Sequence, residues 1–457
     1  MKKLFTALFA ISIATVAFAQ NYPVGHVTKN YIDGARSNRT IQTEVYFPAT
    51  AAGDSSATVQ CVAGQFPTLV FGHGFVMAWD RYDYLWKYFV AQGYVCVFPR
   101  TEGNALSTSH PNFGADLRYL ADLFGTKLNT RPGLFTGHLT SKVAMMGHSM
   151  GGGSTFLGAK NNTQIATTVT FAAAQTNPTS TGAAKNVNVP TLIIAGGVDC
   201  VAPPATNQKL MYDSTAAPIK WYLELKQGTH CNFASQGSVC ELGQMGTCGT
   251  LPRTTQNTRV VNLIAPWLNY YLKGTCGEWQ RFKDSVNVNV ASTNITKISQ
   301  GEPTIPTVSV AGSGSTLTAT GANISTYAWS NAATTASTTV AGSGTYTVTV
   351  TNTATGCTAS AAYIFVGAYN KQVFSNIELF PNPSHSAPTL QITTPQETDL
   401  QLIMTSIDGK ILYQNNYTKQ SSISLVLPTD ALPEGVYFIN VQTDAGKWTG
   451  RWVKVAQ

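Results

Sequence analysis

Short apolar runs that alternate with longer helix-like stretches constrain the fold of residues 20–290 more than any other feature of the sequence. A short apolar run bounded by turn residues is typical of a buried strand, whereas apolar residues three or four positions apart indicate a helix. Strands separated by helices pair in parallel and carry helices on both faces of the sheet. The pattern therefore predicts an α/β domain. The expected strands are 67–71, 94–98, 143–146, 166–171, 191–195 and 221–225, and the expected helices are 80–92, 113–123 and 260–272.

Charge is sparse in this chain of 457 residues, of which 11% are charged, against about 25% in an average soluble domain. Thr, Ser, Asn and Gly supply the polar surface instead, a composition common in exported bacterial proteins. The formal net charge is +7, but the 29 basic residues are scattered and form no basic block. We therefore expect no nucleic-acid partner, because such binding needs clustered Lys and Arg.

The N-terminal segment, residues 1–19, has the pattern of a secretory signal peptide. Lys2 and Lys3 precede an apolar stretch, and Ala17-Phe18-Ala19 fits a small-x-small cleavage site. The alternative is a membrane anchor, which needs about 20 apolar residues, more than this stretch provides. We expect export, with a mature chain that begins at Gln20.

Residues 300–367 change to an all-β pattern. Residues 345–350 alternate strictly between polar and apolar or aromatic side chains, and Gly, Ser, Thr and Asn turns separate the expected strands. Trp329 and Tyr346 are candidate core aromatics. The architecture resembles a small immunoglobulin-like β domain of the kind found as a spacer in surface proteins.

Residues 374–457 form a third region, which carries four ordered motifs. These are Leu379–Pro383, Asp408–Lys410, Gly435–Tyr437 and Val453–Val455. The region resembles the C-terminal sorting domain of the type IX secretion system, an all-β, sandwich-like fold. The resemblance implies the type IX secretion machinery as a partner, a Gram-negative host and transfer across the outer membrane, with removal of the tail at the cell surface. An ordinary β-sandwich accessory domain is the alternative.

Residues Gly147–Gly151 match G-x-S-x-G directly after the apolar run 143–146 and before a stretch compatible with a helix. This is the strand–turn–helix context of the nucleophile elbow in α/β-hydrolases. Small neighbours are needed there because a Cβ would collide with the adjoining strand or helix. Ser149 is therefore the predicted nucleophile.

A serine hydroxyl needs a base, and the base needs a carboxylate that fixes its tautomer. In α/β-hydrolases the acid and then the histidine follow the serine in the chain. Downstream of Ser149 the histidines are His230 and His385, and His385 lies in the expected sorting domain. His230 is therefore the predicted base.

The predicted acid is Asp199, which follows the expected strand 191–195 in a strand-end loop. Asp213 and Glu224 are the alternatives; Asp213 is expected near a helix end and Glu224 inside a strand.

Two backbone N–H groups should stabilise the oxyanion. One belongs to Met150, directly after the nucleophile, and the other to Phe75 in the loop Gly72–Phe75. His73 precedes the nucleophile in the chain, so we interpret it as a loop-shaping residue rather than a second base.

Three collinear blocks resemble bacterial cutinases and polyester hydrolases. They are Gly147–Gly153, Val189–Ile194 leading to Asp199, and Tyr222–Leu225 followed by Thr229-His230. The resemblance implies a triad of Ser149, Asp199 and His230 with oxyanion donors at Phe75 and Met150. It also gives Phe75 a second role as an aromatic wall of the substrate cleft.

One position departs from the family pattern. Members usually have a tryptophan in the loop after the strand that follows the elbow helix, but here Gln175 or a neighbour occupies that place. The stacking surface for aromatic acyl groups is thus reduced. Trp79 is a candidate replacement, although a core role at a helix start is an equal alternative.

Export makes the eight cysteines candidates for disulfides. Cys200 follows Asp199 and Cys231 follows His230, so a formed triad brings them close, and we predict a Cys200–Cys231 bond. No Cys-x-x-Cys spacing or His cluster suggests a metal site. The pairing of the other six cysteines stays open, although a Cys240–Cys248 bond would close a short loop. These six are Cys61, Cys96, Cys240, Cys248, Cys276 and Cys357.

These features together predict a secreted, monomeric serine ester hydrolase of cutinase or polyesterase type, acting through an acyl-enzyme without a cofactor. No lid insertion is apparent, which favours bulky or polymeric esters. A triacylglycerol lipase or general carboxylesterase would share the triad. From another class, the β domains could make the chain a surface-binding or adhesive protein.

Overall fold

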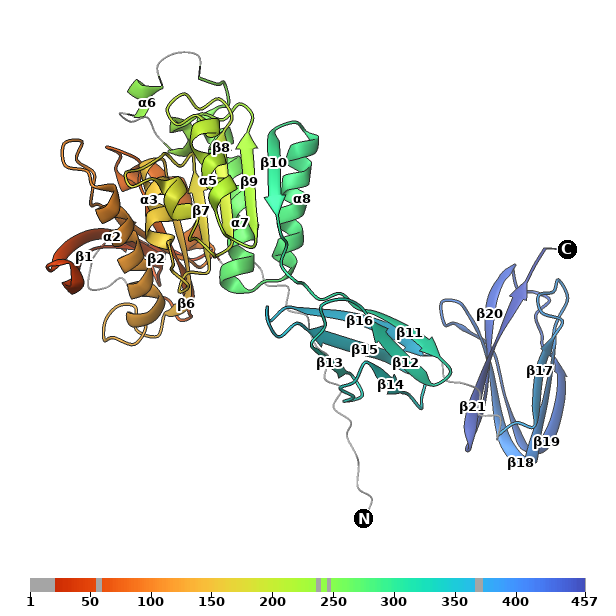
Figure 1. Ribbon diagram of the computed structural model, residues 1–457. Coiled ribbons are helices and arrows are strands. Elements are labelled where there is room, and N and C mark those ends of the chain that lie inside the picture. Colours follow the sequence, from red (N-terminus) through yellow and green to blue (C-terminus); the bar gives the residue numbers. More distant parts are fainter. Residues whose placement is uncertain (1–20, 55–59, 236–239, 245–247, 366–372, 457) are drawn as a thin grey trace. The chain divides into compact units, whose positions relative to one another are not determined.

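The computed structural model describes residues 21–54, 60–235, 240–244, 248–365 and 373–456 (Figure 1). Contacts divide the chain into two units, of which the first runs to Ile305 and also includes Asn352–Thr358. The predicted signal peptide, residues 1–19, lies outside the described residues. Within the described ranges, no helix is both long enough and apolar enough to cross a membrane.

In the described part of the first unit, ten strands form one mixed sheet in the order β10-β9-β8-β7-β6-β4-β5-β2-β1-β3. The neighbours from β9 to β5 pair in parallel, as the alternating pattern predicts. The flanking pairs β10–β9, β5–β2 and β2–β1 are antiparallel. The strands are β1 (Val24–Asp33), β2 (Arg39–Pro48), β3 (Gly53–Asp54), β4 (Phe66–Gly72), β5 (Val95–Pro99), β6 (Leu139–His148), β7 (Thr167–Phe171), β8 (Thr191–Gly196), β9 (Lys220–Leu225) and β10 (Ile295–Gln300).

Two core clusters, one on each face of this sheet, hold the helices in place. Successive residues of a strand point to opposite faces, so Leu69 and Phe71 pack with α1, α7 and α8, while Val70 packs with α2 to α5. The sheet is therefore covered on both sides. The helices are α1 (Asp83–Ala91), α2 (His110–Asp122), α3 (Met150–Ala159), α4 (Ser180–Ala184), α5 (Gln208–Ser214), α6 (Cys240–Gly243), α7 (Arg253–Lys273) and α8 (Gly277–Ala291), with short turns η1 (Gly34–Arg36), η2 (Trp79–Tyr82), η3 (Leu123–Lys127), η4 (Pro204–Thr206) and η5 (Cys231–Phe233).

The sheet continues past residue 290, where the sequence pattern placed the end of the domain. Strand β10 adds an antiparallel edge beside β9. Only Ile295 of this strand is buried, and the next five residues are exposed. An edge strand with one buried side chain has no period-two signal, which is why the pattern gave no strand here.

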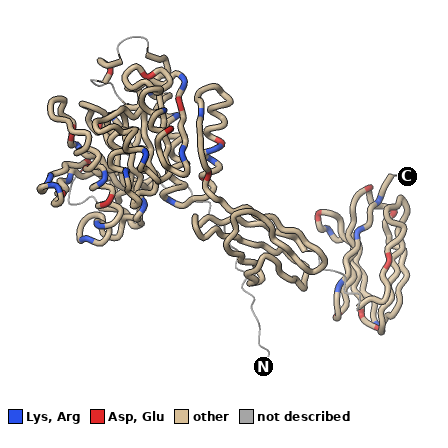
Figure 2. Tube along the Cα trace, viewed as in Figure 1, with Lys and Arg blue, Asp and Glu red and all other residues tan. Residues whose placement is uncertain are grey.

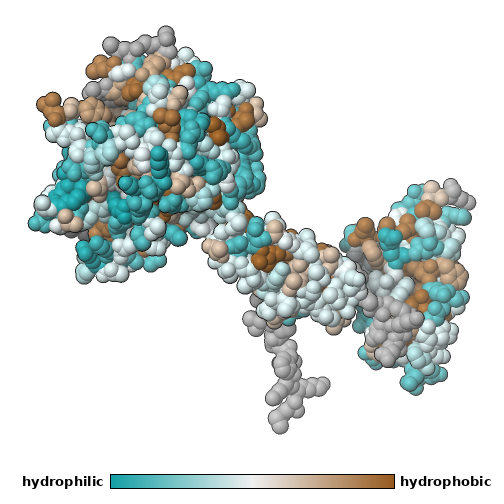
Figure 3. Space-filling view, in the orientation of Figure 1, coloured by the Kyte–Doolittle hydropathy of each residue, from teal (hydrophilic) through white to brown (hydrophobic). Residues whose placement is uncertain are grey.

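Residues 306–365 contain no Asp, Glu, Lys or Arg, and Figure 2 shows this part of the trace without charge colours. In the described residues two three-stranded sheets, β11-β12-β14 and β13-β15-β16, share one core that includes Leu317, Trp329 and Val348. In Figure 3 the visible face of this region is mostly white, the colour of intermediate hydropathy, and the sequence of the region is rich in Thr, Ser, Ala and Gly. The strands are β11 (Ser309–Ser313), β12 (Thr316–Thr320), β13 (Thr326–Trp329), β14 (Ser337–Thr339), β15 (Gly344–Thr351) and β16 (Thr358–Phe365).

The C-terminal region is also all-β, and its two longest strands bend. In β18 the pairing register with β19 shifts between Thr393 and Thr398. Residues before the bend pair with β17, and residues after it pair with β20. One core that includes Leu390, Leu402 and Trp452 spans both halves. The strands are β17 (Asn376–Phe380), β18 (Thr389–Ser406), β19 (Ile411–Val426), β20 (Gly435–Thr443) and β21 (Gly446–Lys454).

A substitution at Gly158 tests the packing of α3 against α2. A Cβ built on Gly158 would lie 2.4 Å from the carbonyl oxygen of Gly114. We expect Gly158→Ala to lower the free energy of unfolding by about 1–3 kcal/mol or more, because the backbones must separate. Gly277→Ala is the matched control, since nothing lies within 4 Å of its Cβ position. Chemical denaturation measures both, and equal stabilities would contradict the packing argument.

Candidate active site

Ser149 lies between β6 and α3, and its backbone has the positive φ of 54° that a sharp strand-to-helix turn requires. Such a conformation costs energy for a residue with a side chain, so neighbouring contacts must hold it. The Ser149 amide donates to the carbonyl of Phe171 at 3.0 Å, and the Ala174 amide donates to the carbonyl of Ser149 at 2.9 Å. The end of β7 therefore fixes the turn.

A close backbone approach lies next to this turn. A Cβ built on Gly151 would be 2.1 Å from the carbonyl oxygen of Gly72, and one built on Gly147 would be 2.4 Å from the carbonyl of Gly151. Only glycine permits these distances. The start of α3 is thus pressed against the end of β4, where the loop Gly72–Phe75 begins.

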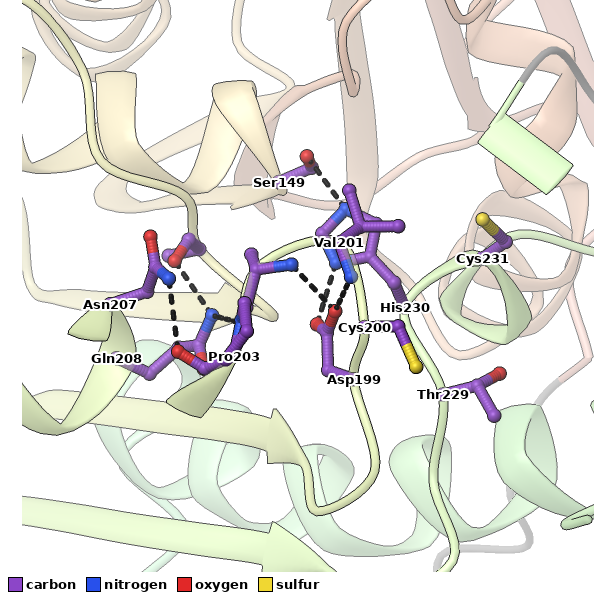
Figure 4. Close-up of polar contacts among 12 residues, drawn as sticks. Ser149, Asp199, Cys200, Val201, Pro203, Asn207, Gln208, Thr229, His230 and Cys231 are labelled. Atoms are coloured by element: carbon purple, nitrogen blue, oxygen red, sulfur yellow. Dashed lines mark hydrogen bonds and ion pairs between the residues drawn. The ribbon is translucent and has the colours of Figure 1, made fainter. Parts of the chain in front are cut away.

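The structure brings Ser149, His230 and Asp199 together (Figure 4). The Oγ of Ser149 is 2.8 Å from Nε2 of His230, and Nδ1 of His230 is 2.6 Å from Oδ2 of Asp199. All three are buried, with 8%, 1% and 4% of their surface exposed. A carboxylate only accepts, so Nδ1 carries the proton and Nε2 is free to accept from the serine hydroxyl.

The other sequence candidates have different partners. Asp213 is on α5 and forms an ion pair with Lys209 at 2.6 Å. Glu224 is inside β9 and accepts a hydrogen bond from the Tyr222 hydroxyl at 2.6 Å. Asp199 is therefore the carboxylate that contacts the His230 ring.

Backbone amides hold the second oxygen of Asp199. Its Oδ1 accepts from the amides of Val201 at 2.8 Å and Ala202 at 2.7 Å. The Gln208 amide nitrogen bridges the carbonyls of Ala173 and Ala202 at 2.8 and 3.1 Å. Hydrogen bonds thus satisfy both oxygens of a buried carboxylate, which would otherwise be costly to desolvate.

The base loop is held by α7. The side-chain amide of Gln256 accepts from the Thr229 amide at 3.0 Å and donates to the Thr229 carbonyl at 2.9 Å. Gln256 is fully buried. Sequence reasoning did not find this residue, because nothing in its local pattern distinguishes it from other polar helix positions.

The two predicted oxyanion residues flank the close approach of β4 and α3. Met150 is the first residue of α3, where a helix leaves its N–H groups without intrahelical acceptors. Phe75 is in the loop after β4 and is 48% exposed. The neighbouring Gly74 amide is fixed by the Tyr82 hydroxyl at 2.9 Å. His73 has its ring within 2.8 and 3.0 Å of the carbonyls of Gly74 and Thr101, which agrees with a loop-shaping role.

Trp79 lies at the start of η2 and lines a cavity of about 970 Å³ beside the loop that carries Phe75. Its indole N–H donates to the Tyr46 hydroxyl at 3.1 Å, and the Arg100 guanidinium covers its ring at 4.3 Å. Gln175 lies in the loop after β7, and its side chain bonds to Thr181 at 2.5 Å.

The predicted Cys200–Cys231 disulfide is wrong. Cys200 bonds to Cys248 and Cys231 bonds to Cys240. The two sulfurs point in different directions in Figure 4 although each cysteine follows a triad residue. The segment that contains α6 supplies both partners instead. The short Cys240–Cys248 loop is likewise excluded.

Of the other four cysteines, two form a disulfide and two are free thiols. Cys276 bonds to Cys357, which settles two of the partners that the sequence left open. Cys61 and Cys96 are buried free thiols. Burial raises the pKa of the Cys61 thiol to about 12, which keeps it protonated. No cluster of three or more potential metal ligands occurs in the described ranges.

Comparison with known proteins gives two matches to families. The family described as PET hydrolase-like matches residues 25–265, and the family described as a secretion system C-terminal sorting domain matches residues 378–455. Curated relatives include Cutinase 1 of Thermobifida cellulosilytica and a cutinase of Thermobifida fusca (strain YX), each 39% identical over 128 residues. Cutinase est1 of Thermobifida alba is 29% identical over 127 residues.

These alignments cover 28% of this chain and 47%, 40% and 41% of the three relatives. The chain thus spans less than half the length of the curated relatives it matches.

Mass mapping of the oxidised protein tests the disulfide pairing. Digestion without reduction should release peptides that link Cys200 to Cys248 and Cys231 to Cys240. The same digest after reduction is the control. A peptide pair that links Cys200 to Cys231 would contradict the structure.

His148 predicts a fall in stability at acid pH. Burial, together with the neighbouring His230, lowers the pKa of His148 well below its usual value. Between that lowered pKa and the unfolded value of about 6.5, the unfolded chain binds more protons than the native one. The free energy of unfolding should therefore fall as pH drops below about 6.5, by up to about 1.4 kcal/mol per pH unit for this imidazole.

Urea unfolding at several pH values between 7.5 and 5 measures this slope. His148→Gln, which keeps a donor and an acceptor, should show a shallower slope than the wild type. An identical slope in both proteins would show that His148 does not contribute.

Proposed function

The chain belongs to the PET hydrolase-like family, and on that premise we propose that it is a secreted serine hydrolase of carboxylic esters, including polyesters. The single observation that carries the proposal is the buried chain of hydrogen bonds from Ser149 through His230 to Asp199. The spacing and tautomer of these groups suit proton transfer from a serine hydroxyl.

In the proposed mechanism Ser149 is the nucleophile, His230 the general base and Asp199 the acid that orients it. His230 takes the serine proton as Oγ attacks the ester carbonyl, and the resulting oxyanion accepts from the amides of Phe75 and Met150. His230 then gives the proton to the leaving alcohol. Water, activated by the same histidine, attacks the acyl-enzyme, and the carboxylic acid leaves as Ser149 is regenerated.

The location of Ser149 supports this assignment. It directly precedes α3, so the positive end of the helix dipole and the free N–H groups of the first turn lie beside the developing negative charge. The two donors are held by the contact of Gly151 with Gly72, which leaves little freedom for either.

We propose that substrate lies against the exposed ring of Phe75, with Trp79 and Gln175 on flanking loops. Gln175 bonds to Thr181 on α4 and offers no stacking face, so aliphatic acyl groups should be favoured over aromatic ones. The aligned relatives are cutinases, and their similarity supports the proposal of a polyester substrate. The triad itself would equally serve a triacylglycerol lipase, so the substrate panel below decides between them.

Export follows from the sorting-domain match at residues 378–455. We propose that the type IX secretion machinery of a Gram-negative bacterium recognises this region and carries the enzyme to or beyond the cell surface. The uncharged region 306–365 is proposed to be an immunoglobulin-like spacer, and the enzyme is proposed to act as a monomer.

Ser149→Ala should abolish hydrolysis of a short p-nitrophenyl ester and labelling by a fluorophosphonate probe. The expected loss in kcat is at least about 10⁴-fold, since neither attack nor acyl-enzyme formation can occur. Ser154→Ala on the same helix is the matched control, because its buried hydroxyl has no hydrogen-bond partner among the described residues. Activity that survives Ser149→Ala would refute the assignment.

A substrate panel distinguishes the alternatives. Aliphatic polyester film should be degraded faster than a long-chain triglyceride emulsion or an aromatic polyester. Faster triglyceride hydrolysis would favour a lipase, and failure of the full chain to label with the probe would favour an adhesive protein.

A further inference from the structure

A buried hydroxyl connects the oxyanion loop to the residue before the nucleophile. Tyr82, the last residue of η2, is fully buried. Its hydroxyl accepts from the Gly74 amide at 2.9 Å and lies 2.8 Å from Nδ1 of His148. The Met77 sulfur is 3.4 Å away and is a weaker acceptor than an imidazole nitrogen.

The other ring nitrogen of His148 continues this connection. Nε2 of His148 is 3.1 Å from the backbone carbonyl oxygen of His230. A carbonyl can only accept, so Nε2 carries the proton and Nδ1 accepts from the Tyr82 hydroxyl. The hydrogen bonds therefore run in one direction, from the Gly74 amide through Tyr82 and His148 to His230.

The imidazole in this chain of bonds is neutral. His148 is fully buried, and burial lowers its pKa well below the usual value. Its ring contacts the rings of His230 and Phe233, with centroids 4.8 and 5.9 Å away. Because the His148 ring is neutral, it does not repel the positive charge that His230 acquires when it takes the serine proton.

The ends of the chain of bonds lie at the proposed catalytic groups. Gly74 precedes Phe75, His148 precedes Ser149, and the last acceptor belongs to His230 itself. The loop is packed tightly here, since a Cβ on Gly74 would be 2.6 Å from the Met77 sulfur and 3.3 Å from the Tyr82 hydroxyl. A displacement of one of these groups would therefore disturb the hydrogen bonds of the others.

We propose that Tyr82 and His148 are positioning residues that hold the oxyanion loop, the nucleophile turn and the base in one catalytic arrangement. This inference rests on the proposed function, because it takes Ser149 as the nucleophile and Phe75 as an oxyanion donor. It goes beyond the triad by assigning the alignment of its parts to a second, buried set of hydrogen bonds.

Tyr82→Phe is the direct test. The substitution removes one oxygen and leaves the Gly74 amide without its acceptor. Loss of an oxyanion donor costs about 10²–10³-fold in kcat, and an error of about 1 Å in position can cost 10²-fold. We expect a partial displacement, with kcat on a p-nitrophenyl ester about 10–100-fold lower and KM changed less than about threefold.

Tyr94→Phe is the matched control. Tyr94 is also fully buried, in the same core cluster, and its hydroxyl donates to Asn269 at 2.8 Å. It precedes β5 and so lies at the opposite end of the parallel strands from Ser149. Its loss of one buried hydrogen bond should lower stability like Tyr82→Phe but leave kcat within about twofold of the wild type.

A double-mutant cycle tests whether Tyr82 and His148 act through the same chain of hydrogen bonds. His148→Gln should also lower kcat, and the combination with Tyr82→Phe should lose much less than the product of the two single effects, since either change breaks the same chain of bonds. Independent, multiplying effects would overturn the proposal. So would a kcat for Tyr82→Phe, or for His148→Gln alone, that equals that of the Tyr94→Phe control.

Active-site titration with a fluorophosphonate separates this proposal from the proposed function. All rates are divided by the titrated sites, so loss of folded protein does not count as loss of kcat. If Ser149→Ala is inactive and Tyr82→Phe is unimpaired, the positioning role fails while the esterase function stands. If Ser149→Ala is active, the esterase assignment itself fails.

Discussion

The contact between the backbones of Gly151 and Gly72 is the constraint on which the proposed active site depends. With 2.1 Å between a hypothetical Cβ and the Gly72 carbonyl, no other residue can occupy position 151 without moving β4 or α3. The contact holds the start of the elbow helix against the loop of Phe75. A parallel sheet supplies the frame, because β4 and β6 are neighbours whose carboxyl ends meet at one edge. The nucleophile turn and the oxyanion loop are therefore held together by this backbone contact, and the side chains of Tyr82 and His148 add a hydrogen-bonded link between them.

The base and acid loops are joined by backbone hydrogen bonds, such as that from the Val198 amide to the Gly228 carbonyl at 3.1 Å, and side chains from distant parts of the sequence hold them further. Gln256 of α7 holds Thr229, and Gln208 of α5 holds the carbonyl of Ala202. The His148 ring also donates to the backbone carbonyl of His230. Each of these groups is buried, and each hydrogen bond is strengthened by the low dielectric around it. Side chains from α7, α5 and the end of β6 thus hold the acid and base loops in position. The three triad residues alone do not account for this arrangement.

The sequence predicted the parallel strands and the positions of Ser149, Asp199 and His230 because each is fixed by local pattern and chain order. A buried strand leaves an apolar run, and each candidate catalytic residue follows the end of a strand. The partners of Cys200 and Cys231 could not be predicted in this way. Proximity to the triad constrains each cysteine to a region, but the choice of partner depends on where the segment around α6 lies. Likewise Tyr82 and Gln256 act through contacts 66 and 27 residues away in the chain, which no local pattern records.

The disulfides of Cys200 and Cys231 lie in loops, where packing restrains the chain less than it does inside the sheet. Cys96 is in the centre of the sheet, where strand pairing and core contacts hold the chain, and it remains a thiol. The bonds of Cys200 and Cys231 instead lie directly after Asp199 and His230, in loops that leave the sheet. A crosslink stabilises most where the unlinked chain has the most freedom to lose. The two bonds attach the α6 segment to the acid loop and the base loop separately. A direct Cys200–Cys231 bond would instead have joined the acid loop to the base loop, which the backbone hydrogen bond from Val198 to Gly228 already joins.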